Sequence, residues 1–180
     1  QTKSFTTATD WLGRRLSMTY PGGEILTYTY DALGQPEALY SSETGGASLV
    51  ELAYNALGKI TSQTLGNGVS ISNTYDAANR LDTRIASLGG TDLMNFGYDY
   101  DSAGNITHIT DGVLGESHTY QYDFLNRLTS AEAVQGANYA YRQQFEYDTI
   151  GNITHVNDWA VSTPQAYREP APYVDLPAVF

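Results

Sequence analysis

The sequence has no cysteine, and this absence excludes two kinds of site. With Cys 0 in 180 residues, neither a disulfide framework nor a thiolate metal site can form, and the redox compartment stays open. Long apolar runs are missing as well. No stretch approaches the ~20 residues that span a bilayer, and the first residues, Gln1 to Phe5, lack a hydrophobic signal core. We therefore expect no membrane insertion, and either a removed signal or a piece of a longer chain.

Basic residues are also scarce. There are 9 Lys+Arg against 20 Asp+Glu, for a formal net charge of -11. Nucleic-acid binding needs clustered Lys and Arg to displace counterions from phosphates, so it is excluded as a function class. Anionic membrane surfaces are disfavoured for the same reason.

Tyrosine and glycine are abundant instead, with Tyr 15 and Gly 17. Tyrosine suits a half-buried pleated surface and glycine suits turns, which indicates β structure. A five-residue word recurs with tyrosine first, Asp or Asn second and Gly or Asn fifth, and its tyrosines are 24, 21, 25, 22 and 25 residues apart. This spacing predicts one supersecondary unit repeated in series. The defining residues of the six clear words are Tyr30, Asp31, Gly34; Tyr54, Asn55, Gly58; Tyr75, Asp76, Asn79; Tyr100, Asp101, Gly104; Tyr122, Asp123, Asn126; and Tyr147, Asp148, Gly151.

A seventh, degenerate word precedes these as Thr9 to Gly13, with threonine in the tyrosine place. In every word the second residue can accept bonds from backbone N–H groups two residues on, which opens a type I turn. The fifth residue must take a left-handed conformation to rejoin the returning strand, and Gly or Asn does this at least cost. We therefore interpret these residues as structural turn residues.

The segments beside each word alternate with a period of two. Tyr28 and Tyr30 share one face, as do Tyr98 and Tyr100, so stacked repeats build an aromatic ladder. Apolar residues restart that face six positions past the tyrosines, and a looser glycine turn closes each unit. The sequence predicts an all-β fold, a meander of antiparallel hairpins, one per repeat, in a curved or spiralling sheet with very little helix.

The words are of two alternating kinds. Asn79-Arg80-Leu81 recurs as Asn126-Arg127-Leu128 after 47 residues, and Gly104-Asn105-Ile106 recurs as Gly151-Asn152-Ile153 after another 47. We expect the two kinds of hairpin end to lie on opposite rims of a winding sheet.

The repeat pattern ends near Trp159, so we predict a repeat sheet over residues 1–159 and a proline-rich extended tail or strap over 160–180. Four of the six prolines fall after Ser162, and proline lacks the N–H that a central strand needs. The tail lies either on its own sheet or on a neighbouring subunit. Its candidate contact residues are Tyr167, Tyr173, Val174, Leu176, Val179 and Phe180.

Patterns for metal binding, catalysis and sugar binding are weaker than the repeat pattern. Asp99 and Asp101 resemble part of a calcium loop, but Ala103 stands where an oxygen ligand is needed. The histidines have no metal spacing, and every Asp available for a catalytic triad is a turn residue. We expect no enzyme activity and no cofactor. Tyrosine rings can stack on sugars, but packing against each other within the sheet is the favoured interpretation.

The words resemble those of the Rhs/YD-repeat family. Asn73 to Leu81 and Tyr98 to Ile106 are similar to typical copies, and the resemblance covers about residues 5 to 158. It implies a long β-ribbon that spirals into a hollow shell in bacterial Rhs proteins, insecticidal toxin-complex subunits and animal teneurins. In the bacterial members the shell encloses a C-terminal toxin.

Seven repeats are too few for a closed shell of that kind, so we expect structural material that forms a shell or a self-assembling filament or tube. Unpaired sheet edges and the tail would make the contacts. The partners are then further copies in a homo-oligomer or polymer, or the remainder of a larger YD shell. The alternatives are a surface module that binds carbohydrate or contacts cells, and a fragment of a toxin-encapsulating Rhs shell. The expected location is secreted or cell-surface, in a bacterium.

Overall fold

The protein is an all-β chain, as the repeat predicts. The computed structural model describes residues 4–135 and 138–159. The proposed tail over 160–180, with its contact residues Tyr167, Tyr173, Val174, Leu176, Val179 and Phe180, lies outside the described residues.

Over the described residues, fourteen strands follow one another in a single antiparallel meander, so that the strand order in the sheet is the order in the sequence. A short 3-10 helix, η1 (Ser42–Thr44), lies between β4 and β5. The strands are β1 (Thr6–Thr9), β2 (Arg15–Thr19), β3 (Ile25–Tyr30), β4 (Pro36–Ser41), β5 (Ser48–Tyr54), β6 (Ile60–Leu65), β7 (Val69–Tyr75), β8 (Leu81–Leu88), β9 (Thr91–Tyr100), β10 (Ile106–Asp111), β11 (Glu116–Tyr122), β12 (Leu128–Gln135), β13 (Asn138–Tyr147) and β14 (Ile153–Trp159). The prediction of two strands per repeat is confirmed.

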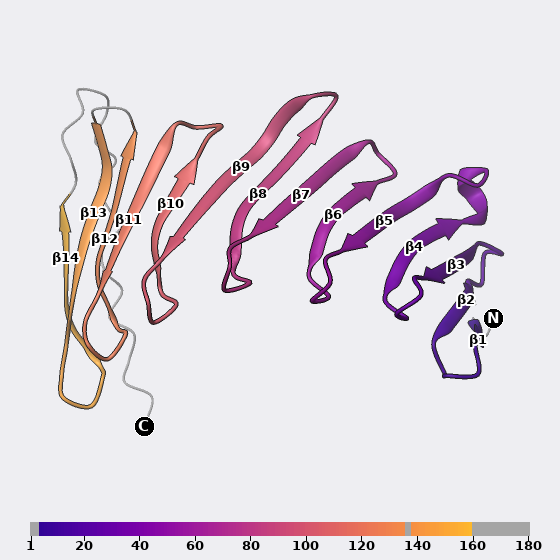
Figure 1. Cartoon of the computed structure of the whole chain (residues 1–180), viewed down its shortest axis with the longest axis horizontal. Helices are drawn as coiled ribbons and strands as arrows, with labels where there is room; N and C mark the ends of the chain where they lie inside the picture. Colours follow the sequence, from indigo (N-terminus) through magenta and orange to yellow (C-terminus); the bar gives the residue numbers. More distant parts are fainter. Residues whose placement is uncertain (1–3, 136–137, 160–180) are drawn as a thin grey trace. The chain divides into compact units, whose positions relative to one another are not determined.

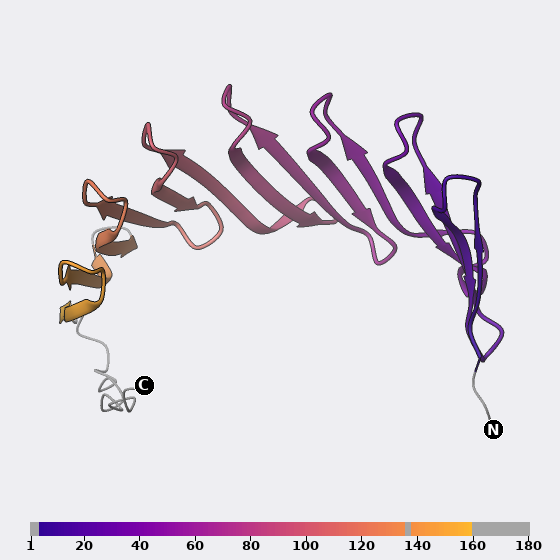
Figure 2. The same cartoon turned by 90° about the horizontal axis from the view of Figure 1, so that it is seen from below.

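The chain divides into two compact units, Gln1–Ser117 and His118–Phe180. The first contains β1 to β10, and the second contains β12 to β14 with most of β11. Within the first unit the hairpins lie side by side in one layer, and no second layer of described residues covers either face (Figures 1 and 2).

All word turns of the first unit lie at the same end of their strands, which corrects the expectation of opposite rims. They follow β1, β3, β5, β7 and β9 and form the lower row of turns in Figure 1. In a meander every second turn lies at the same end of the strands. The two kinds of word, such as those that contain Arg80 and Asn105, therefore lie at the same end. We call this the word-turn end. The glycine turns between successive repeats form the other end.

The two faces of the first unit differ in character. Directly paired residues share a face. The face that carries the word tyrosines, which we call the tyrosine face, also carries pairs such as Val50 with Leu65 and Ala86 with Met94. The opposite face is rich in hydroxyls. There Thr74 and Thr83 Oγ1 atoms are 2.7 Å apart.

Little of the described chain is fully buried. The buried hydrophobic residues are four alanines, and no large side chain among the described residues is completely enclosed. A single layer has no second layer to cover it, so backbone ladders and contacts between neighbouring hairpins hold it together. The four are Ala38, Ala86, Ala131 and Ala133.

Candidate functional site

The word turns are built around one carboxylate or amide oxygen. Asp31 Oδ1 accepts hydrogen bonds from the N–H groups of Leu33 at 2.9 Å and Gln35 at 2.8 Å. Asn55 Oδ1 does the same at 3.0 Å each, toward Leu57 and Lys59. The oxygen therefore satisfies two backbone donors that the turn leaves without strand partners. The same arrangement surrounds Asp10, Asp76, Asp101, Asp123 and Asp148.

The fifth residue of each word adopts the left-handed conformation. Asn79 and Asn126 have φ of 60° and 61°, and the corresponding residue is glycine in the other words, as at Gly104 with φ 93°. Gly34 has a second reason to lack a side chain, because an added Cβ would lie 2.8 Å from Arg14 Nη1 of the preceding word. The preceding repeat thus reaches over this turn.

The turn hydrogen bonds favour ionised aspartates. A side-chain bond from Asn152 lowers the pKa of Asp148 below its ordinary value, and backbone N–H donation at Arg127 lowers the pKa of Asp123. Donors that bond the charged form stabilise it relative to the acid. These carboxylates are thus committed to the turns.

The word tyrosines join each repeat to the one before it. Tyr100 donates its hydroxyl hydrogen bond to the Leu81 carbonyl at 2.8 Å, and Leu81 is the seventh residue counted from the preceding word tyrosine, Tyr75. The hydroxyl therefore reaches back from one hairpin to the next-earlier one. The same bond joins Tyr30 to Arg15, Tyr54 to Pro36, Tyr75 to Ile60 and Tyr147 to Leu128, at 2.7 to 2.8 Å.

Arginine at the sixth position makes the reciprocal contact. Arg80 Nε donates to Asp76 Oδ2 in its own word at 2.8 Å. Its Cζ lies 4.4 Å from the ring centre of Tyr100 in the next word, and its Nη1 donates to the Asp101 carbonyl at 3.0 Å. A guanidinium over a ring adds a cation–π attraction to the charge pair. Arg80 therefore clamps two consecutive words together.

Arg127 repeats this arrangement in the second unit. It donates to Asp123 Oδ2 at 2.7 Å, lies 4.5 Å over the ring of Tyr147 and donates to the Asp148 carbonyl at 3.2 Å. Arg14 lies 4.6 Å over Tyr30. We call this combination the arginine clamp.

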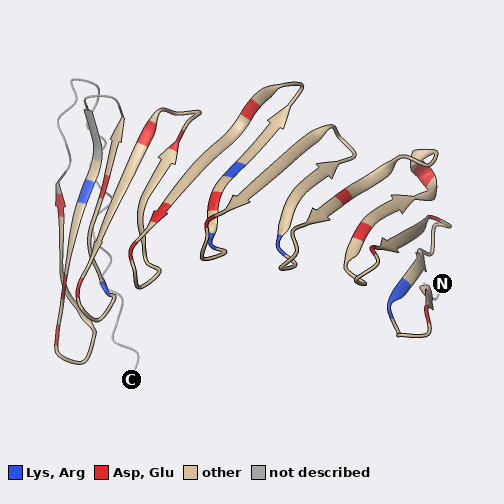
Figure 3. Cartoon of the chain, viewed as in Figure 1, with Lys and Arg blue, Asp and Glu red and all other residues tan. Residues whose placement is uncertain are grey.

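Asparagine at the sixth position of the word makes its hydrogen bond within its own turn. Asn105 and Asn152 each donate from Nδ2 to Oδ2 of their own word's aspartate, at 2.9 Å. This explains the 47-residue alternation in the sequence, because an arginine clamps to the next word while an asparagine closes its own. In Figure 3 the ribbon of the first unit carries blue segments, which mark Lys and Arg, at the word-turn end. Lys59 and Arg80 lie in the word turns that follow β5 and β7.

The histidines, which have no metal spacing in the sequence, lie on strands. His108 lies on β10, with Nε2 3.1 Å from Ser117 Oγ, and His155 lies on β14. Among the described residues, no three His, Asp or Glu side chains are grouped closely enough to hold a metal ion. No helix in the described ranges is long and apolar enough to cross a membrane.

The tyrosine ladder is partly enclosed. Burial, together with the neighbouring Tyr141, raises the pKa of Tyr120 to about 12. Strongly exposed rings lie instead at the tips of word turns, where Trp11 is 89% exposed and Phe124 is 90% exposed. The word does not predict this exposure, because its third residue varies.

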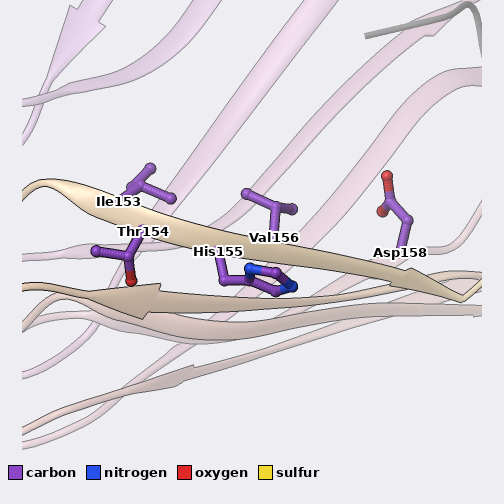
Figure 4. A pocket seen from close by; sticks show the side chains of 5 residues that line it. All are labelled: Ile153, Thr154, His155, Val156 and Asp158. Carbon is purple, nitrogen blue, oxygen red and sulfur yellow. The ribbon is translucent and has the colours of Figure 1, made fainter.

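The two edge strands are the places where the ladder can grow. β1 begins the strand order and β14 ends it. β14 pairs with β13 on one side, and an open hollow of about 420 Å³ lies along it, lined by Ile153, Thr154, His155, Val156 and Asp158. Figure 4 shows Ile153 and Val156 on one side of the strand and His155 on the other.

Comparison with known proteins agrees with this architecture. The family model described as RHS Repeat matches residues 54–92 and 100–137. No curated protein matches the sequence.

Solved structures of similar fold include TcdB2-TccC3 and a Tc holotoxin pore. The crystal structure of TcdB2-TccC3 matches with a TM-score of 0.76 and 23% identity, over 88% of this chain and 9% of that one. The form without the hypervariable C-terminal region matches with a TM-score of 0.75 and 23% identity, over 91% of this chain and 9% of that one. The Photorhabdus luminescens Tc holotoxin pore, with the mutation TccC3-D651A, gives a TM-score of 0.73 at 23% identity, over 86% and 9%.

This chain thus spans about a tenth of the length of those structures. The matched repeats and the hairpin fold together confirm the resemblance to the Rhs/YD-repeat family.

Proposed function

We propose that the chain is structural material, a segment of a YD-repeat wall that further strands lengthen at its edges. The observation that carries this proposal is the repeat junction. Five word tyrosines donate a hydroxyl hydrogen bond to a backbone carbonyl of the preceding hairpin. The side chains that define the family therefore fasten hairpins to each other. The aspartates are likewise committed to their turns.

By likeness to the TcdB2-TccC3 structures, the wall is part of a larger shell outside a bacterial cell, secreted or at the cell surface. Toxin encapsulation belongs to the whole protein of which this chain is a segment. Copies of the chain can also add edge to edge, because a contact that does not close propagates into a filament or tube.

Electron microscopy of the purified 180-residue chain, with light scattering over a concentration series, tests the assembling form. We expect filaments, tubes or rings of uniform width that grow with concentration. Monomers at every concentration would overturn self-assembly. Hydrolytic activity that purifies with the chain would overturn a purely structural role.

Carbohydrate or cell-surface binding is a second candidate function. The exposed rings of Trp11 and Phe124 favour it, because aromatic faces stack on sugars. We expect saturable glycan binding to be lost in Trp11→Ala and Phe124→Ala variants if this function is real. Binding that these changes leave intact would remove this candidate.

A further inference from the structure

The register between successive hairpins is the same wherever the structure gives it. Counting from each word tyrosine, or from Thr9 in the first word, the residue eight positions later lies opposite the residue three positions before the next word tyrosine. Ser62, eight past Tyr54, pairs with Ser72, three before Tyr75. The other pairs are Ser17 with Thr27, Ala38 with Glu51, Thr83 with Gly97, and Ser130 with Gln144. One rule therefore fixes how a following hairpin joins.

The hydrogen-bond acceptor for that following hairpin is equally regular. The carbonyl at the seventh position accepts the next tyrosine hydroxyl at each of the five junctions described above. In the last word this position is Ile153, at the beginning of edge strand β14. An arginine clamp is not required, since Tyr54 and Tyr75 make their bonds across junctions that carry Gln35 and Lys59.

The side chains of β14 are correspondingly uncovered. Ile153 is 56% exposed and Val156 is 44% exposed. At the position of Ile153 in earlier words, the apolar Leu81 and Leu128 are half-buried where the next repeat lies beside them, whereas Arg15 and Pro36 are exposed. Ile153 and Val156 point to the same side of the strand (Figure 4), which is the side of the tyrosine face, since Val156 pairs with Phe145.

The other edge of the array differs. The word beside β1 has Thr9 in the tyrosine place. A threonine side chain ends at Oγ1 and cannot span the distance to a preceding hairpin, which a tyrosine ring bridges elsewhere. The first word can therefore accept from a following repeat, as Arg15 does from Tyr30, but it cannot donate to a preceding one.

We propose that the sheet is directional, with β14 as the receiving edge for a further YD hairpin and β1 as an edge that lacks the matching donor. This proposal rests on the proposed structural function, and it identifies a further YD hairpin as the partner of the β14 edge. The incoming strand places its word tyrosine hydroxyl on the Ile153 carbonyl. The residue three before that tyrosine lies opposite His155, eight past Tyr147.

The test restores the missing donor in the full chain. A Thr9→Tyr variant should associate head to tail, with the tyrosine of one copy on β14 of the next. A Thr9→Phe variant supplies the ring without the hydroxyl and is the matched control. We expect sedimentation and light scattering to give a dissociation constant about fivefold to tenfold lower for Thr9→Tyr than for Thr9→Phe, the effect of one hydrogen bond.

Disulfide trapping checks the register, because the chain has no cysteine of its own. Thr6 lies three before Thr9, so Thr6→Cys with His155→Cys, in the Thr9→Tyr chain, should form an intermolecular ladder on a non-reducing gel. Directly opposite residues are within disulfide range. Thr7→Cys with His155→Cys is the control, since adjacent residues point to opposite faces.

The outcomes separate the two proposals. Equal association of the Thr9→Tyr and Thr9→Phe chains overturns the directional rule and leaves assembly through strand edges standing. A ladder from the Thr7→Cys pair in place of the Thr6→Cys pair overturns the register. Monomers in every variant overturn both the directional rule and self-assembly.

Discussion

At the scale of single residues, the tyrosine and the aspartate of the word make hydrogen bonds over different separations along the chain. The aspartate acts within its own turn, on N–H groups two and four residues away, as Asp101 does on Ala103 and Asn105. The tyrosine acts across hairpins, on a carbonyl 15 to 19 residues earlier in the chain. Losing one or the other should therefore have different consequences.

A Tyr100→Phe change should lower the free energy of unfolding by about 1 kcal/mol, the net value of one hydrogen bond. It removes the bond to the Leu81 carbonyl and keeps the ring that Arg80 stacks on. Tyr98→Phe is the control, on the same face of the same strand, because the Tyr98 hydroxyl makes no hydrogen bond within the described residues. Chemical denaturation measures both, and equal losses would show that the hydroxyl bond contributes nothing.

The word aspartates should make stability depend on acid pH. Hydrogen bonds from Asn105 and Asn152 lower the pKa of Asp101 and Asp148. A carboxyl whose folded pKa is depressed contributes stability above its unfolded pKa, and that contribution is lost as the pH falls through the folded value. The melting temperature should therefore hold steady near neutral pH and fall below about pH 4.

A chain with Asp101→Asn and Asp148→Asn tests the source of that fall. The amide oxygen can still accept the backbone bonds, as Asn55 does. The bonds from Asn105 and Asn152 are lost, because an amide NH2 group replaces the Oδ2 atom that accepts them. We expect a slightly lower melting temperature at neutral pH and a smaller fall on acidification, measured by circular dichroism. A fall as large as in the unchanged chain would place the acid sensitivity elsewhere.

The difference between the local turn bonds and the tyrosine bond between hairpins explains what the sequence could and could not predict about the junction between repeats. The turn is local, so the position of Asp31 and the left-handed residue at Gly34 follow from turn chemistry alone. The partner of Tyr30 is the backbone of Arg15, and a backbone carbonyl leaves no mark in a sequence. The periodicity therefore revealed that repeats exist, but not what fastens one to the next.

At the scale of the hairpin, the sixth position of the word decides how a repeat meets its neighbour. The sequence showed the alternation of Arg80 and Asn105, but its cause required the positions of the next ring and carbonyl. Gln35 is the informative case. Its Oε1 atom is buried with no hydrogen-bond partner among the described residues, although Asp31 and Tyr54 stand where a clamp would use them.

A Gln35→Arg change should build a further arginine clamp, with Asp31 as the ion-pair partner and Tyr54 as the ring. We expect stabilisation of about 1 to 2 kcal/mol, from the cation–π contact and the removal of an unsatisfied oxygen. Gln35→Met removes the oxygen without adding a charge, so it should give a smaller gain. Equal gains in chemical denaturation would show that the clamp itself adds nothing.

At the scale of the whole molecule, the sheet behaves as a one-dimensional array. Each described junction involves neighbouring hairpins, and the register rule is the same at each. In such arrays stability is approximately the sum of the repeats and the interfaces between them. The all-β meander was predictable because seven words impose it together. The near absence of a buried core was not, because the alternating pattern shows which face is apolar but not whether anything covers it.

This additivity predicts that a whole repeat can be removed but half of one cannot. Deleting residues 76–100 joins Tyr75 to Asp101, which recreates a complete word, and every remaining strand keeps its direction. We expect a folded, all-β chain whose melting temperature falls by a few degrees. Deleting residues 76–88 instead removes one strand, β8, so β9 must run the opposite way and Tyr100 loses its carbonyl partner. That chain should lose cooperative unfolding in thermal circular dichroism. If both deletions melt alike, the word-based junctions do not govern the stability of the array.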